Sequence, residues 1–232
     1  MENNPNLSKY NSMCRIRDLG LPTVKFKGYY YSDINVLLGS SRARIEKRKE
    51  FEGHVADLLA TNGIFGIRTE SVTFNPVGHF PHGFPIRSLK EATNFIENTH
   101  TQKYNRGANY GELFYIVNEG IPVERMVFNA VVTLDFAFGR WKLDGNINYV
   151  DTLCLRDAMK VSKNLIDVST LCNNDVAYLR RALLDAGLID GEYAEVSRFK
   201  DPYRTIFWEI RSGHRKRLFS YEDTIVGMYG IT

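Results

Sequence analysis

Apolar residues recur along the chain at two spacings, one typical of β-strands and the other of α-helices. Residues 23–31 (TVKFKGYYY) and residues 64–74 alternate with a period of two and are predicted strands. Between them, apolar positions at helical spacing follow Ser40-Ser41, which can cap a helix, and end at Gly63, which can stop one. Ser88 is the expected cap of a second helix that runs to about residue 98.

The middle of the chain continues this mixture of strands and loops. Further strands are predicted at residues 112–118, 125–138 and 141–150. Prolines and glycines predict a loop at 75–85, and a polar stretch predicts another at 99–111. We therefore expect a flexible lead-in over residues 1–20, followed by an α+β domain over residues 21–150.

The last third of the chain has the most distinctive order of elements. Helices are predicted at residues 151–164, 168–172 and 173–186. Gly187 follows the last of these, and two alternating segments then occupy 193–199 and 205–210, with a turn between them. Helix, stop and hairpin in this order resemble winged helix-turn-helix domains. The resemblance implies a winged-helix domain with a basic tail over residues 151–232, and an α+β fold class overall.

In that family the second helix of the turn enters the major groove of double-stranded DNA, and the hairpin contacts the backbone beside it. The candidate DNA contacts on the helix are Asn173, Asn174, Tyr178 and Arg181. Basic residues of the hairpin and tail are expected to neutralise phosphates: Arg198, Lys200, Arg204, Arg211, Arg215, Lys216 and Arg217. Winged helices also serve as protein-binding modules, so a protein-interaction adaptor is the alternative without nucleic acid.

Residues 46–64 resemble the opening helix of PD-(D/E)xK nucleases, in which a Glu stands beside a Phe and a Gly ends the helix. The resemblance implies that Glu52 is the helix acid and that Mg²⁺ is held by two carboxylates beside a lysine. The family's Asp followed by Glu-x-Lys is missing. The candidate catalytic residues are Glu52, Glu112, Asp135, Lys142 and Asp144, with Asp135 and Asp144 as the metal ligands.

Three weaker patterns point to other chemistry. Residues 141–145 (WKLDG) fit the K-x-D-G pattern of nucleotidyltransferases such as DNA ligases, although a β-turn explains the same letters. His79, His82 and His100 lack the further ligands that a zinc site needs. The polar loop at 99–111 suits a flipped base, which leaves a DNA base-modifying enzyme as another alternative.

Composition narrows the class of protein. The chain has 232 residues, 44% of them hydrophobic and 25% charged, which is ordinary for a globular protein, and its net charge is +3. The 3 cysteines are widely spaced, which argues against a disulfide framework or a structural zinc site. No apolar run approaches the roughly 20 residues of a membrane span. Together with the winged-helix resemblance, these properties lead us to expect a cytoplasmic DNA-binding protein, whose N-terminal domain serves either to form a homodimer or to bind an effector. The alternative is a Mg²⁺-dependent nuclease, and no cofactor other than that Mg²⁺ is expected.

Overall fold

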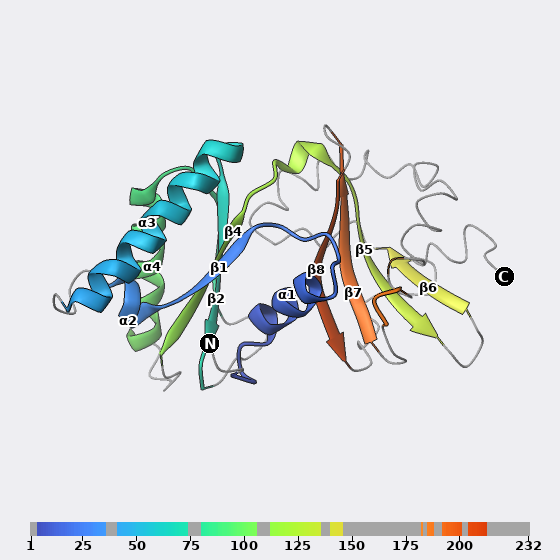
Figure 1. The fold of residues 1–232 in the computed structure, drawn as a ribbon, viewed down its shortest axis with the longest axis horizontal. Helices are drawn as coiled ribbons and strands as arrows, with labels where there is room; N and C mark the ends of the chain where they lie inside the picture. Colours follow the sequence, from blue (N-terminus) through green and yellow to red (C-terminus); the bar gives the residue numbers. More distant parts are fainter. Residues whose placement is uncertain are drawn as a thin grey trace. The chain divides into compact units, whose positions relative to one another are not determined.

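The computed structural model describes residues 4–35, 41–73, 80–105, 112–135, 140–145, 182, 185–187, 192–200 and 204–212 (Figure 1). The chain divides into two compact units. Unit 1 contains Met1–Asn11 and Val24–Pro122, and unit 2 contains Ser12–Thr23 and Val123–Thr232. Each unit contains an antiparallel sheet, which confirms the predicted α+β fold class.

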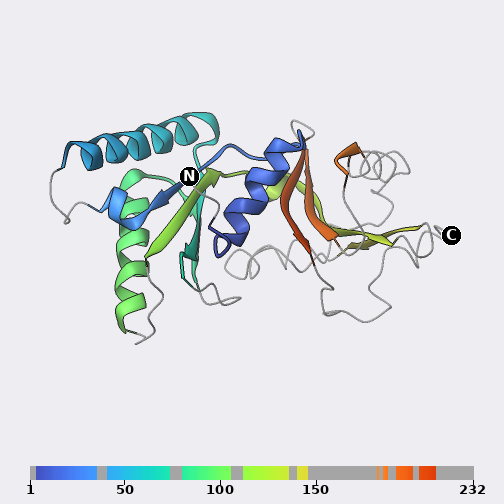
Figure 2. The ribbon, with the colours of Figure 1, turned by 60° about the horizontal axis from the view of Figure 1, so that its bottom comes forward.

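Unit 1 is built on a four-stranded antiparallel sheet in the order β1-β4-β2-β3. Its strands are β1 (Phe26–Tyr30), β2 (Phe65–Ser71), β3 (His82–Ile86) and β4 (Leu113–Glu119). Its helices are α2 (Tyr31–Ile34), α3 (Arg42–Asn62) and α4 (Leu89–Asn105), together with the first residues of α1 (Ser8–Asp18). Figures 1 and 2 show α3 and α4 on one face of the sheet and the first turn of α1 on the opposite face.

The core of unit 1 lies between the sheet and helices α3 and α4. Phe51 and Leu58 of α3 pack with Phe65, Ile67 and Val117 of the sheet, and all five side chains are buried. Fully burying one such side chain contributes roughly 1.5–3 kcal/mol. The buried residues of α3 all lie from Phe51 onwards, because only that part of the helix packs on the sheet.

The boundaries of α3 agree with the sequence prediction. The Ser41 hydroxyl accepts a hydrogen bond from the Arg44 backbone N–H at 3.4 Å, which caps the helix start. Gly63 ends the helix with φ at 69°, a left-handed conformation that favours glycine. Both signals are local in sequence, so they were visible without the tertiary structure.

A buried pair of side chains links β1 to α3: Tyr29 lies on β1 and His54 on α3. The Tyr29 hydroxyl and His54 Nδ1 are 3.2 Å apart. Burial lowers the pKa of His54 from 6.5 to about 4, and burial also raises the pKa of Tyr29 above its usual value. Both side chains are therefore neutral in the folded protein at neutral pH.

Three segments differ from the sequence prediction. Residues 8–18 form α1 instead of a flexible lead-in, because Met13 and Ile16 are fully buried. β3 forms within the predicted proline-rich loop, and its Pro85 is tolerated because β3 is an edge strand. α4 continues to Asn105, past its predicted end.

Unit 2 contains a second four-stranded antiparallel sheet, in the order β6-β5-β7-β8. Its elements are the short 3₁₀ helix η1 (Val123–Arg125), β5 (Met126–Asp135), β6 (Arg140–Gly145), β7 (Glu192–Phe199) and β8 (Arg204–Ser212). The edge of β8 is covered by residues 12–23: Ser12 Oγ donates to Ile210 O at 2.9 Å, and Phe207 N donates to Pro22 O at 2.8 Å. Covering an edge in this way satisfies backbone groups that would otherwise be open to a further strand.

The winged-helix domain is not shown by the described residues. The predicted hairpin exists as β7 and β8, but β7 also pairs with β5, so the hairpin belongs to a larger sheet. Strands from both sides of residue 150 are thus joined in one sheet. The predicted helices at 151–164 and 168–172 lie outside the described residues, as does most of 173–186. Among the helices described, none is long and apolar enough to cross a bilayer.

Candidate functional site

The two predicted catalytic acids of unit 1 make local structural contacts. Glu52 forms an ion pair with Arg48, one helical turn away, with Nε and Oε1 2.8 Å apart. Glu112 accepts a hydrogen bond from the Ser32 backbone N–H at 3.0 Å, at the start of α2. Within unit 1, the two carboxylates therefore take part in separate contacts, Glu52 on α3 and Glu112 at α2.

The predicted metal ligands of unit 2 are separated by the strand register. Asp135 lies opposite Arg140, and Asp144 lies opposite Val131. The two positions are therefore roughly 13 Å apart along the hairpin, at about 3.3 Å for each residue. Lys142 lies between them on β6, opposite Thr133. No group of three or more His, Cys, Asp or Glu residues among those described is placed to hold a metal ion.

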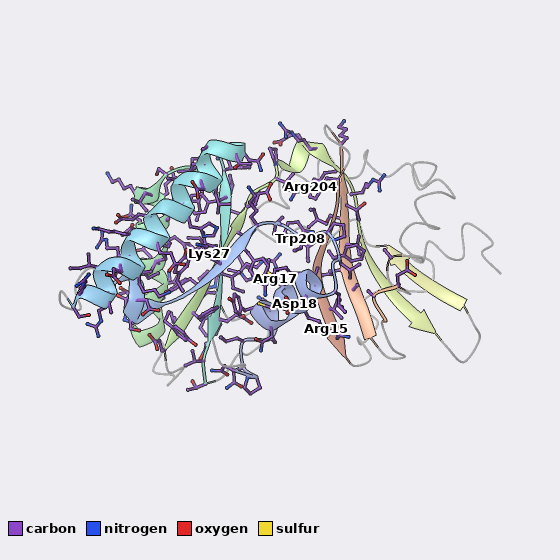
Figure 3. The ribbon with its side chains drawn as sticks, in the orientation of Figure 1. Arg15, Arg17, Asp18, Lys27, Arg204 and Trp208 are labelled. Carbon is purple, nitrogen blue, oxygen red and sulfur yellow. The ribbon has the colours of Figure 1, made fainter. Side chains whose placement is uncertain are left out.

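Two of the predicted DNA contacts that the structure describes have side-chain partners within unit 2. Arg198 donates to Thr205 Oγ1 at 2.7 Å, and Arg204, labelled on β8 in Figure 3, donates to Thr23 O at 3.4 Å. Lys200 is exposed in the turn between β7 and β8. The side chain of Arg211 lies outside the described residues, as do Asn173, Asn174, Tyr178, Arg181, Arg215, Lys216 and Arg217.

Three basic residues from three elements lie on the face of the unit 1 sheet opposite α3 and α4. We call Lys9 of α1, Arg68 of β2 and His82 of β3 the basic cluster. Lys9 Nζ lies 3.3 Å from His82 Nε2, and Arg68 stands directly opposite His82 in the strand register. Lysine has no acceptor, so the ammonium donates and His82 Nε2 accepts.

The first turn of α1 is seated by aromatic packing. The Tyr10 ring makes edge contacts with Phe26 and Phe114, with centroids 5.8 and 4.9 Å apart. Gly28 leaves the space for these rings, because a Cβ there would lie 2.8 Å from Tyr10 Cε2 and closer still to Phe114. This packing brings Lys9, which neighbours Tyr10, over β2 and β3.

A buried carboxylate completes the attachment of α1. Glu70 of β2 has no exposed surface, and its two oxygens accept hydrogen bonds from the backbone N–H groups of Lys9 and Tyr10, at 2.9 and 3.0 Å. Those N–H groups belong to the first turn of a helix, where no intrahelical acceptor exists. Glu70 therefore acts as a helix cap supplied by a distant strand.

The basic cluster is chemically suited to an anion. Arginine offers a planar fork of donors that matches carboxylate and phosphate oxygens, and lysine offers a compact positive charge. Glu70 supplies one negative charge beside these basic groups. A phosphate-bearing ligand would supply the charge and the acceptors that the cluster can use.

Unit 2 contains the opposite arrangement, two carboxylates in adjacent strands. We call Glu195 of β7 and Glu209 of β8 the acidic pair. They are directly opposite one another in the register, and Glu209 is only 6% exposed. Two carboxylates in directly opposite positions of neighbouring strands are close enough to contribute oxygen ligands to one divalent cation.

An irregularity in β8 creates the acidic pair. From Phe199↔Arg204 to Val196↔Phe207 the pairing is regular, and the register then shifts so that Glu195 faces Glu209 instead of Trp208. The displaced Trp208, labelled in Figure 3, donates from Nε1 to Ser197 Oγ at 2.8 Å. Bulges of this kind commonly re-aim a side chain beside an active site.

Neither set of residues was identified as a site from the sequence. His82 was considered only as a zinc ligand, and Lys9 stood in the presumed lead-in. Both glutamates lie in the segment interpreted as a wing. The sequence does place Glu195 and Glu209 in the two strands of one predicted hairpin. Regular pairing from the turn, however, would place Glu195 opposite Trp208 and not opposite Glu209.

No protein-family model matches the chain, and no curated protein matches its sequence. Solved structures do resemble it. The D-Ala-D-Ala ligase of Helicobacter pylori is 10% identical, with 89% of this chain and 51% of that chain covered and a TM-score of 0.42. The VanG D-Ala:D-Ser ligase of Enterococcus faecalis is 11% identical, with 96% and 57% covered and a TM-score of 0.46. Cdc123 of Schizosaccharomyces pombe is 11% identical, with 100% and 93% covered and a TM-score of 0.44.

The chain thus spans about half the length of the two D-alanine ligases. The predicted functions in DNA binding, DNA cleavage and base modification are wrong. The three similar structures are named as two ligases and Cdc123, and none of them is named as a DNA-binding protein or a nuclease. The β7–β8 hairpin, interpreted as the DNA-contacting wing, is part of a four-stranded sheet.

Proposed function

We propose that this chain is an ATP-dependent enzyme of the ligase type, which binds the phosphates of a nucleoside triphosphate at the basic cluster. The observation that supports this most strongly is the placement of Lys9, Arg68 and His82, from three separate elements, on one face of the sheet. Lys9 and Arg68 can both donate to phosphate oxygens, while His82 holds the Lys9 ammonium through Nε2. Two cations in one place suit a ligand with several negative charges better than a single carboxylate.

We also propose that the acidic pair of unit 2 binds a divalent cation. Mg²⁺ prefers oxygen ligands and is usually held by one or two carboxylates, with substrate phosphates and waters completing its shell. Glu195 and Glu209 supply two carboxylates in opposite register positions. The Mg²⁺ expected from the sequence is thus kept in the proposal, with these ligands in place of Asp135 and Asp144.

Formation of ADP from ATP tests the proposal. With Mg²⁺ and a mixture of amino acids, the protein should release ADP, and Arg68→Met should remove nearly all of that activity because it removes the forked phosphate donor. Arg87→Met is the matched control, since Arg87 is exposed elsewhere in unit 1. Ligation, the activity for which two of the similar structures are named, is the reaction to assay first.

Equal ADP release by the wild type, Arg68→Met and a no-protein blank would contradict the proposal. Loss of activity in both Arg68→Met and Arg87→Met would also count against it, because the effect would then not depend on the basic cluster. The homodimer and the cytoplasmic location expected from the sequence remain predictions.

A further inference from the structure

We infer that Glu70 is a positioning residue for the phosphate site, an inference that rests on the proposed function. Glu70 does not belong to the basic cluster. It holds the backbone of Lys9, whose ammonium reaches His82, through the 2.9 Å bond from the Lys9 N–H. One buried carboxylate thereby determines where the cationic side chain of α1 lies over the sheet.

The sequence of α1 explains why a distant acid is needed. Leu7 precedes the helix and has no side-chain acceptor, so the start of the helix lacks the Ser, Thr, Asp or Asn that usually caps it. Glu70 replaces that cap with two charge-assisted hydrogen bonds from backbone N–H groups, and Ser8 Oγ adds a longer contact at 3.5 Å. The negative charge also lies at the positive end of the helix dipole.

The strand geometry links Glu70 to the rest of the cluster. Arg68 and Glu70 are two residues apart on β2, so they lie on the same face of the sheet. Arg68 stands opposite His82, the residue that Lys9 reaches. Consequently, the strand that carries the arginine also carries the carboxylate that places the lysine, and the spacing between the two cations depends on Glu70.

Lysine reactivity tests the inference without any ligand. The full-length protein is labelled with an amine-reactive ester, and mass spectrometry compares Lys9 with Lys90, an exposed lysine of α4. In Glu70→Gln, which retains the shape but loses the charge and one acceptor, labelling of Lys9 should rise while that of Lys90 stays the same. If Glu70→Gln does not fold, Glu70→Asp is the second variant, because its shorter side chain keeps the charge but cannot reach both N–H groups. Labelling of Lys9 should rise in this variant as well.

Pyrophosphate affinity provides the second readout. Glu70→Gln should weaken binding of inorganic pyrophosphate about fivefold, equivalent to roughly 1 kcal/mol, because the Lys9 ammonium is no longer held in place over the sheet. Lys9→Met should weaken binding less in the Glu70→Gln background than in the wild type, because the two residues act through the same contact. A purely structural Glu70 would lower the melting temperature without this non-additivity.

The outcomes separate this inference from the proposed function. Unchanged Lys9 labelling in a folded Glu70 variant, or additive effects of the two substitutions, would overturn the positioning role. The third outcome combines two results: Lys9 labelling rises in the Glu70 variant, but the wild type does not bind pyrophosphate. That outcome would support the placement of Lys9 by Glu70 and would overturn the proposed phosphate site.

Discussion

The basic cluster and the acidic pair concentrate charge of opposite sign, and they are assembled differently. The basic cluster draws one residue each from α1, β2 and β3, and it depends on aromatic packing and on Glu70. The acidic pair lies within a single hairpin and depends on one shift of register. The basic cluster therefore requires the tertiary fold of unit 1, whereas the acidic pair requires only local strand geometry.

Each set of residues suits its own ligand. The cations of unit 1 suit phosphate oxygens, and the carboxylates of unit 2 suit a divalent cation. If this account is correct, substitutions in unit 1 should affect phosphate binding, and substitutions in the hairpin should affect the metal. The predictions below separate the two sites, beginning with the largest expected effect.

Arg68→Met should reduce affinity for Mg²⁺–ATP by about 100-fold, because a charge-assisted contact contributes roughly 1.5–3 kcal/mol. Titration calorimetry measures the change, with Arg87→Met as the control. Affinity for Mg²⁺ alone should be unaffected, since the acidic pair does not involve Arg68. An equal loss for the metal and the nucleotide would remove the distinction between the sites.

Gly28→Ala should break the basic cluster without altering any charge. The new methyl group would overlap Phe114 and Tyr10 and displace the first turn of α1. Overpacking of this kind costs about 1–3 kcal/mol of folding free energy. Urea unfolding should report that loss, and ATP affinity should fall while Mg²⁺ affinity is retained. Gly53→Ala is the control, because a Cβ at Gly53 meets no atom within 4 Å.

Acid should destabilise unit 1 through His54, independently of the basic cluster. Its pKa falls from 6.5 to about 4 on folding, so the unfolded chain binds more protons between these values. The stabilisation is present in full above about pH 6.5 and is lost as pH falls towards 4, on the order of 2 kcal/mol. Urea midpoints measured across this range should fall in the wild type and change less in His54→Gln. Equal slopes in the two proteins would contradict the assigned cause.

Glu195→Gln should have effects of opposite sign with and without metal. In EDTA it removes a like-charge pair and should stabilise the protein by about 0.5–1 kcal/mol. In excess Mg²⁺ it removes a ligand, so the variant should gain less stability from the metal than the wild type does. Urea unfolding under the two conditions measures this, with exposed Glu124→Gln as the control. The same shift under both conditions would mean that the acidic pair holds no cation.

Local signals predicted the elements that the chain specifies within a few residues. Ser41 and Gly63 set the ends of α3, and period-two alternation identified β1, β2, β4 and the β7–β8 hairpin. α1 was missed because its cap, Glu70, lies on a different element. β3 was missed because Pro85 predicts a loop unless the strand is known to be at an edge.

The candidate site was less predictable, for a related physical reason. The three members of the basic cluster are far apart in the sequence and meet only after β2 pairs with β3 and α1 packs on them. The acidic pair lies within a predicted hairpin, yet the register shift at Trp208 cannot be obtained by counting residues from the turn. The winged-helix interpretation identified the hairpin correctly but did not predict that β5 and β6 extend it into a four-stranded sheet.

The central claim is that the basic cluster binds the phosphates of a nucleoside triphosphate. Titration calorimetry with a non-hydrolysable ATP analogue in the presence of Mg²⁺ tests this claim most directly. Three proteins are compared: the wild type, the double variant Lys9→Met/Arg68→Met, and the matched double variant Lys90→Met/Arg87→Met. The account predicts that the wild type and the matched variant bind equally and that the basic-cluster variant loses at least about 100-fold in affinity. Equal binding by all three proteins, or binding by none of them, would contradict it.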